Sequence, residues 1–121
     1  MSQTASYLDT QSIFNLIGQH ADLAIIFQSV SEWLEARIPD SIVSIMLYSE
    51  AEQTLNLISS TKHFSTQYQQ AIKDLKIGPN VGACGAAAFH RDLVICENLA
   101  TDQNWEVFQP LIQEENLNAC W

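Results

Sequence analysis

Residues 77–105 of this 121-residue chain read IGPNVGACGAAAFHRDLVICENLATDQNW. This segment contains three of the four glycines (Gly78, Gly82 and Gly85) together with Cys84 and Cys96. Glycine is favoured where the backbone takes a positive φ or passes close to another segment. The pattern fits either a nest of backbone amides facing an anionic ligand or a tight turn that lets a helix of small residues lie against a sheet. Because no Lys and Ser or Thr follow the glycines as in a phosphate loop, the tight turn is favoured.

Two stretches near the N-terminus have apolar residues at intervals of three and four, which is typical of amphipathic helices. The first predicted helix covers Ser12–Ile17 and ends at Gly18. The second begins after Asp22 and ends before Pro39, because a residue that precedes proline is pushed out of the helical region. Its apolar face comprises Leu23, Ile26, Phe27, Val30, Trp33, Leu34 and Ile38.

Three further helices are predicted downstream. One begins at Ser65 and carries its apolar side on Tyr68, Ala71, Ile72 and Leu75. The next covers Cys84–His90, directly after the glycine-rich turn. In the region of the last, Thr101 or Asp102 offers a cap, and Pro110 fits the first turn of a helix better than its interior. Asn116, which tolerates a left-handed backbone, suits the end of that helix.

β-Branched, aromatic and apolar residues predict a hairpin in the first half of the chain. SIVSIMLYS at 41–49 and TLNLISS at 54–60 are the strands, and the polar residues EAEQ form the turn. Val43, Ile45 and Leu47 share one face of the first strand, and Leu55 and Leu57 point inward from the second. LVICE at 93–97 is predicted to be a short strand, and LNACW at 117–121 the opening of another. The fold class is therefore α+β.

Composition excludes several classes of protein. With 14 acidic and 5 basic residues the formal charge is −9, which disfavours binding to nucleic acid. No run is long enough for a membrane span, and the N-terminus lacks the pattern of a secretion signal, so we expect a cytoplasmic protein. The three cysteines, Cys84, Cys96 and Cys120, are then expected to be reduced thiols packed as small hydrophobic side chains.

Three motifs together resemble the GAF domain family of small sensory modules: IGPNVGACGAAAF, LVICENLATDQNW and ACW. The likeness is closest to bacterial members with a GPxxGxCGxAA, TDxxW and ACW pattern. It implies a PAS-related antiparallel sheet with flanking helices, in a single domain over 1–121 with a leading helix region at 1–20 and a core at 21–121. It also implies a non-catalytic regulatory role, with a histidine kinase or an enzyme of cyclic di-GMP metabolism as the attached or partner effector.

The sequence departs from that pattern at two kinds of position. Ala83 and Ala86 stand where the family usually has serine and threonine, so the turn lacks two hydroxyl groups. The family's C-terminal strands, the last of which lies beside the first strand, are missing after ACW, which predicts an incomplete domain. Ser41–Ser49 would then have an unsatisfied edge that a partner chain could fill.

The resemblance also implies a small-molecule pocket between the first strand and the glycine-rich segment. Its candidate residues are Val43, Ile45, Leu47, Ile77, Val81, Cys84, Ala87, Phe89 and Trp105. An alternative is a thiol enzyme similar to the free methionine-R-sulfoxide reductases of this fold, with Cys84 at the start of a helix as the reactive thiol. A third alternative is an interaction module that pairs through its sheet edge.

Other residue classes give weaker indications. His20, His63 and His90 have no cysteine or carboxylate at metal-ligand spacing, so neither a metal nor another cofactor is expected. Glu32, Glu35, Glu114 and Glu115 are interpreted as solvated helix faces. The apolar residues of the leading helix exceed what one short helix buries, which favours a homodimer; they are Leu8, Ile13, Phe14, Leu16 and Ile17.

Overall fold

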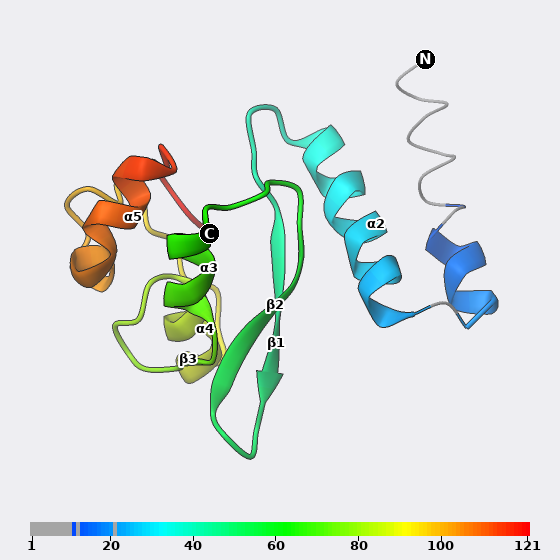
Figure 1. Cartoon of the computed structure of the whole chain (residues 1–121), viewed down its shortest axis with the longest axis horizontal. Coiled ribbons are helices and arrows are strands. Elements are labelled where there is room, and N and C mark those ends of the chain that lie inside the picture. The colour runs from blue at the N-terminus through cyan, green and yellow to red at the C-terminus, as the bar shows by residue number, and fades with distance from the viewer. Residues whose placement is uncertain (1–10, 12, 21) are drawn as a thin grey trace. The chain divides into compact units, whose positions relative to one another are not determined.

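The computed structural model describes residues 11, 13–20 and 22–121, and Leu8 and Ser12 of the predicted leading helix lie outside that part. Helical residues at 13–18 precede the main elements. These follow in the order α2 (Leu23–Arg37), β1 (Ser44–Ser49), β2 (Thr54–Ser60), α3 (Thr66–Ile72), β3 (Leu75–Lys76), α4 (Cys84–His90), the 3-10 helix η1 (Gln103–Phe108) and α5 (Gln109–Glu114) (Figure 1). The predicted α+β class is confirmed.

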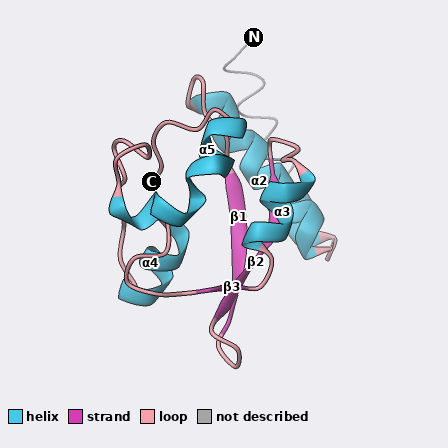
Figure 2. Cartoon of the chain, turned by 60° about the vertical axis from the view of Figure 1, so that its left-hand side comes forward, coloured by secondary structure: helices cyan, strands magenta, loops and turns pink. Residues whose placement is uncertain are grey.

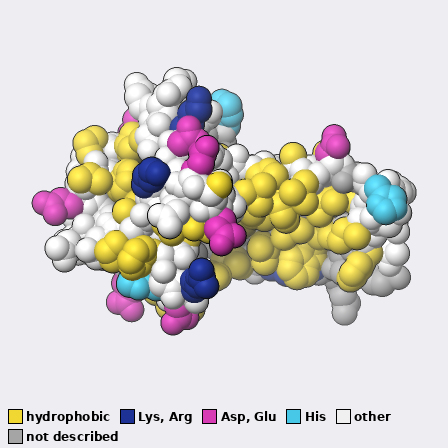
Figure 3. All heavy atoms as spheres, turned by 90° about the horizontal axis from the view of Figure 1, so that it is seen from below, with side chains coloured by type: hydrophobic (Ala, Val, Ile, Leu, Met, Phe, Trp, Pro, Cys, Tyr) yellow, Lys and Arg dark blue, Asp and Glu magenta, His cyan; other side chains and the backbone are white. Residues whose placement is uncertain are grey.

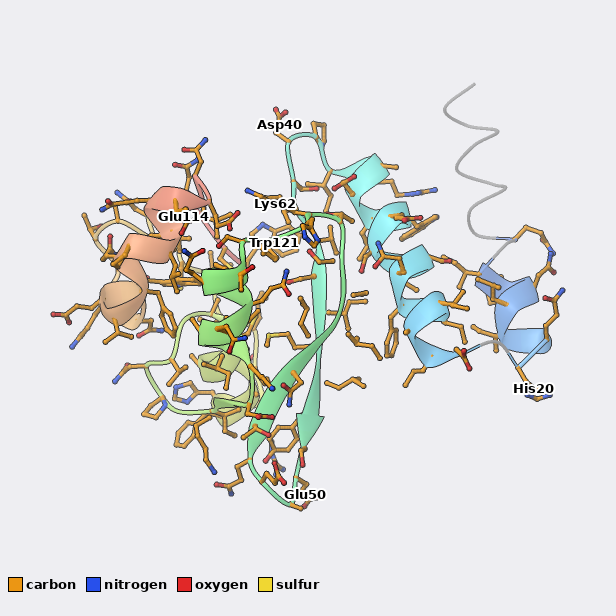
Figure 4. All side chains as sticks on the ribbon, viewed as in Figure 1. His20, Asp40, Glu50, Lys62, Glu114 and Trp121 are labelled. Atoms are coloured by element: carbon orange, nitrogen blue, oxygen red, sulfur yellow. The ribbon has the colours of Figure 1, made fainter. Side chains whose placement is uncertain are left out.

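The sheet is open and antiparallel, with the strand order β1-β2-β3 (Figure 2). The predicted hairpin is confirmed, and Glu50 lies at its tip (Figure 4). β3 pairs with the start of β2, where Thr54 lies opposite Lys76 and Leu55 opposite Leu75. β1 is therefore an edge strand, because β2 is its one strand neighbour among the described residues.

The contacts divide the chain into two compact units, and the boundary passes through the hairpin. The first unit comprises the described part of Met1–Ile45 together with Leu57–His63, and the second comprises Met46–Asn56 with Phe64–Trp121. Each unit is therefore described by itself. The prediction of one domain over 1–121 stays a prediction.

In the first unit, α2 is joined to β2 by polar side chains that sequence periodicity does not reveal. Ser31 is fully buried, and its hydroxyl lies 2.8 Å from that of Ser59. The Gln28 side chain makes two bonds to the backbone of Ser60: its Nε2 donates to the carbonyl (2.9 Å), and its Oε1 accepts from the amide (3.3 Å). Leu23, at the start of the predicted apolar face, is by contrast 51% exposed.

In the second unit, local capping rules decide where the helices begin and end. Ser65 caps α3 by accepting from the amide of Tyr68 (3.1 Å), and Asp102 caps η1 by accepting from the amide of Asn104 (2.8 Å). Pro110 lies in the first turn of α5, and Asn116 takes a left-handed φ of 55° just beyond it, as predicted. The buried core of this unit comprises Ala83, Cys96, Leu99, Trp105 and Ile112.

Three expectations about the strands and helices were wrong. Leu75 belongs to β3 and not to α3, because the chain turns extended at Lys73 and pairs with β2. The strands predicted at 93–97 and 117–121 reduce to one bridge between Cys96 and Cys120. Leu47, one of the pocket candidates, is 40% exposed. No helix within the described residues has the length and hydrophobicity needed to cross a lipid bilayer.

Candidate functional site

The glycine-rich turn is tied to the segment that precedes η1. Gly82 has a left-handed φ of 54°, and its amide donates to the carbonyl of Asn104 (2.8 Å). The side chain of Asn104 returns a bond from Nδ2 to the carbonyl of Gly82 (3.2 Å). Asn104 of the TDQNW motif therefore holds the glycine-rich turn at Gly82 in place.

Close packing accounts for the glycines themselves. A Cβ at Gly85 would lie 2.7 Å from Cβ of Val81, and one at Gly82 would lie 3.4 Å from the ring of Trp105. The amides are also engaged: that of Gly82 by Asn104, and that of Gly78 by the carbonyl of Gly85 (3.4 Å). At these positions the structure has a tight turn whose amides bond to the chain's own carbonyls, not a nest open to an anion.

Two alanines stand where the GAF pattern usually has serine and threonine, and both are buried. Ala83 is 3% exposed and Ala86 is 1% exposed. Ala83 packs in the core with Leu99 and Trp105. A serine or threonine here would need a buried hydrogen-bond partner, so alanine suits an apolar environment at these positions.

Trp105 anchors this region. It is 8% exposed, covers Gly82, and meets Phe108 edge-to-face with ring centroids 5.7 Å apart. Its indole Nε1 is buried and makes no hydrogen bond of ordinary length and angle to any described residue. Trp121, by contrast, is 73% exposed. Trp105 is therefore a core residue and Trp121 a surface residue, although both belong to the motifs quoted from the sequence.

The three thiols are reduced and lie close enough to interact electrostatically. Cys96 is buried and bridges Cys120 across two antiparallel segments, with reciprocal backbone bonds of 2.7 and 2.9 Å. Burial raises the pKa of Cys120 to about 12, and the charges of Cys84 and Cys96 add to the shift. Burial and then the charge of Cys96 raise the pKa of Cys84, so the thiol is desolvated although the residue as a whole is exposed.

Cys96 and Tyr68 complete the set of shifted groups. Burial raises the pKa of Cys96; the indole N–H of Trp105 opposes that shift, and Asp102 adds to it. Burial also raises the pKa of Tyr68 to about 12, with further contributions from Cys84, Cys120 and Glu115. All four groups are therefore neutral at neutral pH, whereas a thiol nucleophile needs a lowered pKa.

These shifts predict a loss of stability in alkali. In the folded state Tyr68 and Cys120 both have a pKa of about 12. In the unfolded chain the ordinary pKa is 10.0 for Tyr68 and 9.0 for Cys120. Their contribution is therefore fully present below pH 9 and lost as pH rises toward 12, by up to about 1.4 kcal/mol per pH unit for each group. Urea unfolding with reductant present, between about pH 8 and about pH 11, should show this decline. Cys120→Ala should make the decline shallower, and a flat profile would contradict the assignment.

The other pocket candidates fall into separate groups. Val43 and Ile45, both half-buried, belong to the first unit, and the remaining candidates belong to the second. In the second unit, Val81 packs against Gly78 and Gly85. Ile77 and Ala87 are half-buried, whereas Phe89 is 50% exposed and touches His90 edge-to-face at 5.2 Å.

Two residues of this region, Glu115 and Tyr68, were not predicted from the sequence to belong to the site. Glu115, interpreted as a solvated surface residue, is 7% exposed, and its Oε1 accepts from the amide of Ser65 (2.8 Å). Tyr68 stacks on Phe64 at 4.2 Å. The only sequence signal for Glu115 is its place just before the left-handed Asn116, where the chain turns inward. Within the described residues, no three His, Cys, Asp or Glu side chains are placed to hold a metal ion.

The histidines named in the sequence are scattered over the described part of the chain. His90 approaches the carbonyl of Pro79 at 3.4 Å, and His20 lies in the turn before α2 (Figure 4). The resemblance to GAF domains rests on the motifs quoted above. No protein-family model, curated protein or solved structure matches this chain.

Proposed function

We propose that this chain is a non-catalytic regulatory module of GAF type that acts by pairing with a second copy through the edge of β1. The observation that carries the proposal is the strand order β1-β2-β3, with β1 bordered by one strand among the described residues. An edge strand presents a row of amide and carbonyl groups that a second strand can satisfy. Pairing through such an edge would allow a conformational change in the module to be transmitted to an effector.

Two hydrogen bonds show which backbone groups near the start of β1 face β2 and which face the open edge. The amide of Thr61 donates to the carbonyl of Val43 (2.9 Å), and the amide of Val43 donates to Oγ1 of Thr61 (2.9 Å). Val43 therefore directs its backbone groups toward β2. Since these groups alternate along a strand, the amide of Ser44 points away from β2, to the open edge.

Exposed apolar residues support association. Large hydrophobic side chains reach the surface in the view of Figure 3. The exposed large hydrophobic residues of the first unit, by exposed fraction, include Phe14 (65%), Ile17 (51%), Leu23 (51%), Ile25 (51%) and Ile42 (41%). Phe14 and Ile17 belong to the leading helix that the sequence assigned to dimerisation. Burying such residues against a second copy is favourable in proportion to the area removed from water.

A small-molecule ligand and an effector enzyme are parts of the proposal that rest on the sequence resemblance, whereas a cytoplasmic location is proposed from the sequence composition. The reductase alternative has less support, because burial raises the pKa of Cys84. A ligand would be detected by native mass spectrometry of the chain purified without denaturant. Ligand occupancy would change the stability of the pair only if the ligand binds the two association states differently.

Ser44→Pro is the test of the pairing edge. Proline removes the outward amide and obstructs a neighbouring strand, yet is tolerated at the first residue of an edge strand. We expect self-association measured by sedimentation equilibrium to weaken by at least about tenfold. Ser44→Ala, which keeps the amide, is the matched control and should associate as the unmodified chain does. A chain that stays monomeric at every concentration would refute the proposal.

A further inference from the structure

Cys96 and Cys120 are directly opposite each other in the second unit. Each donates its amide to the carbonyl of the other, at 2.7 Å from Cys96 and 2.9 Å from Cys120. One further backbone bond, from the amide of Leu99 to the carbonyl of Asn118 (2.9 Å), holds the same two segments together. The bridge is isolated, with no longer ladder on either side.

This register brings the two side chains to the same side of the paired segments. Directly opposed residues of a hydrogen-bonded antiparallel pair have Cα atoms about 5.5 Å apart, which lies within the range that a disulfide spans. Their Cβ atoms are about 5 Å apart, so bond formation requires a closure of about 1 Å. An isolated bridge resists such a shift less than the centre of a sheet would, because few neighbouring bonds must move with it.

The surroundings of both thiols are those of the apolar core. Cys96 is 1% exposed and belongs to the buried core, and Cys120 is half-buried against that core. Neither thiol is taken up by a metal cluster within the described residues. Cys84 interacts electrostatically with both but has no bridge to either segment, so the backbone does not hold it in register.

We propose that Cys96 and Cys120 form a reversible intramolecular disulfide when the chain meets a low-molecular-weight disulfide such as oxidised glutathione. The thiolate of the more accessible Cys120 attacks one sulfur of the oxidant, releases one small thiol and forms a mixed disulfide. The Cys96 thiolate then attacks the Cys120 sulfur and releases the second small thiol. Two protein thiols lose two protons and two electrons, and the oxidant is reduced to two thiols, so the exchange balances.

The bond would staple the segment that ends in ACW to the segment that follows α4. It closes a loop of about 25 residues that contains η1 and α5, which restricts the unfolded chain. For a chain of this size the expected rise in Tm is about 10 °C. The reaction is slow at neutral pH, because burial keeps both thiols protonated, and faster in mild alkali.

The test uses the full chain carrying Cys84→Ala, so that this third thiol cannot capture the oxidant. The reduced protein is incubated with oxidised glutathione at about pH 8.5, quenched with acid and alkylated. We expect tandem mass spectrometry to find the Cys96 and Cys120 peptides linked within one chain, with the mass of two hydrogen atoms lost. Tm should rise by about 10 °C and return to its starting value on reduction.

Two matched variants and a second route make the outcome decisive. Cys84→Ala combined with Cys96→Ala, or with Cys120→Ala, should give a glutathione adduct and no rise in Tm. If the native chain does not react, the exchange is repeated during refolding from urea in a glutathione buffer. Glutathione on both cysteines without a linked peptide, a bond between two chains, or a linked product with a lower Tm would each overturn the proposal.

Discussion

Replacing Trp105 with alanine should lower the free energy of unfolding by about 4 kcal/mol, the range found for large aromatic residues removed from a core. Trp105 is 8% exposed, packs with Ala83, Leu99 and Ile112, and covers the Gly82 backbone. Its removal leaves a cavity where the glycine-rich turn meets the cap of η1. We therefore expect the loss to be one of packing, and both segments to loosen together.

Urea unfolding followed by far-ultraviolet circular dichroism measures this effect without relying on tryptophan fluorescence. Trp121→Ala is the matched control, since the same side chain is removed at a residue that is 73% exposed. It should change stability by less than about 0.5 kcal/mol. Equal losses at the two tryptophans would show that Trp105 is not the anchor of this core.

Gly85→Ala should be the second most damaging change, with a loss of about 2 kcal/mol. The added Cβ would lie 2.7 Å from Cβ and 2.8 Å from Cγ1 of Val81, and these atoms lie next to the backbone and cannot swing aside. Alanine is otherwise the better helix former by about 1 kcal/mol. The expected loss of stability is therefore the steric cost of the added Cβ minus this gain. Hydrogen exchange should show the loss as faster opening of α4.

Gly18→Ala provides the control for that substitution, because a Cβ there meets nothing within 4 Å. It should be neutral or slightly stabilising. Combining Gly85→Ala with Val81→Gly removes both conflicting atoms and should recover part of the stability, beyond what the two single changes predict by addition. If Gly85→Ala is as stable as the unmodified chain, close packing does not explain this glycine.

Sequence reasoning succeeded wherever a local rule decides the structure. The α4 bounds, the start of a helix at Ser65, the cap at Asp102, the place of Pro110 and the left-handed Asn116 all depend on residues near one another in the chain. The tight-turn interpretation of the glycines was also available from composition. It follows from the small residues around Cys84 and from the lack of a phosphate-loop lysine.

The errors arose where distant partners decide. Leu75 continues the apolar spacing of α3, yet pairing with Leu55 draws it into a strand. Glu115 was interpreted as a solvated surface residue, but it is buried and accepts from the amide of Ser65. Ser31, which sequence periodicity does not single out, is buried with its hydroxyl against that of Ser59. Periodicity cannot show such contacts, because it reports the apolar side of an element and not the partner that meets its polar groups.

The side-chain amide of Gln28 bears on how copies of this chain would assemble if they pair through β1 as proposed. It bonds both backbone groups of Ser60, as a neighbouring strand would, at one end of β2. Leu75 and Lys76 pair with the residues at the other end of β2. If copies pair through β1 as proposed, the Ser60 end of β2 is closed to a further strand, because Gln28 already bonds its amide and its carbonyl.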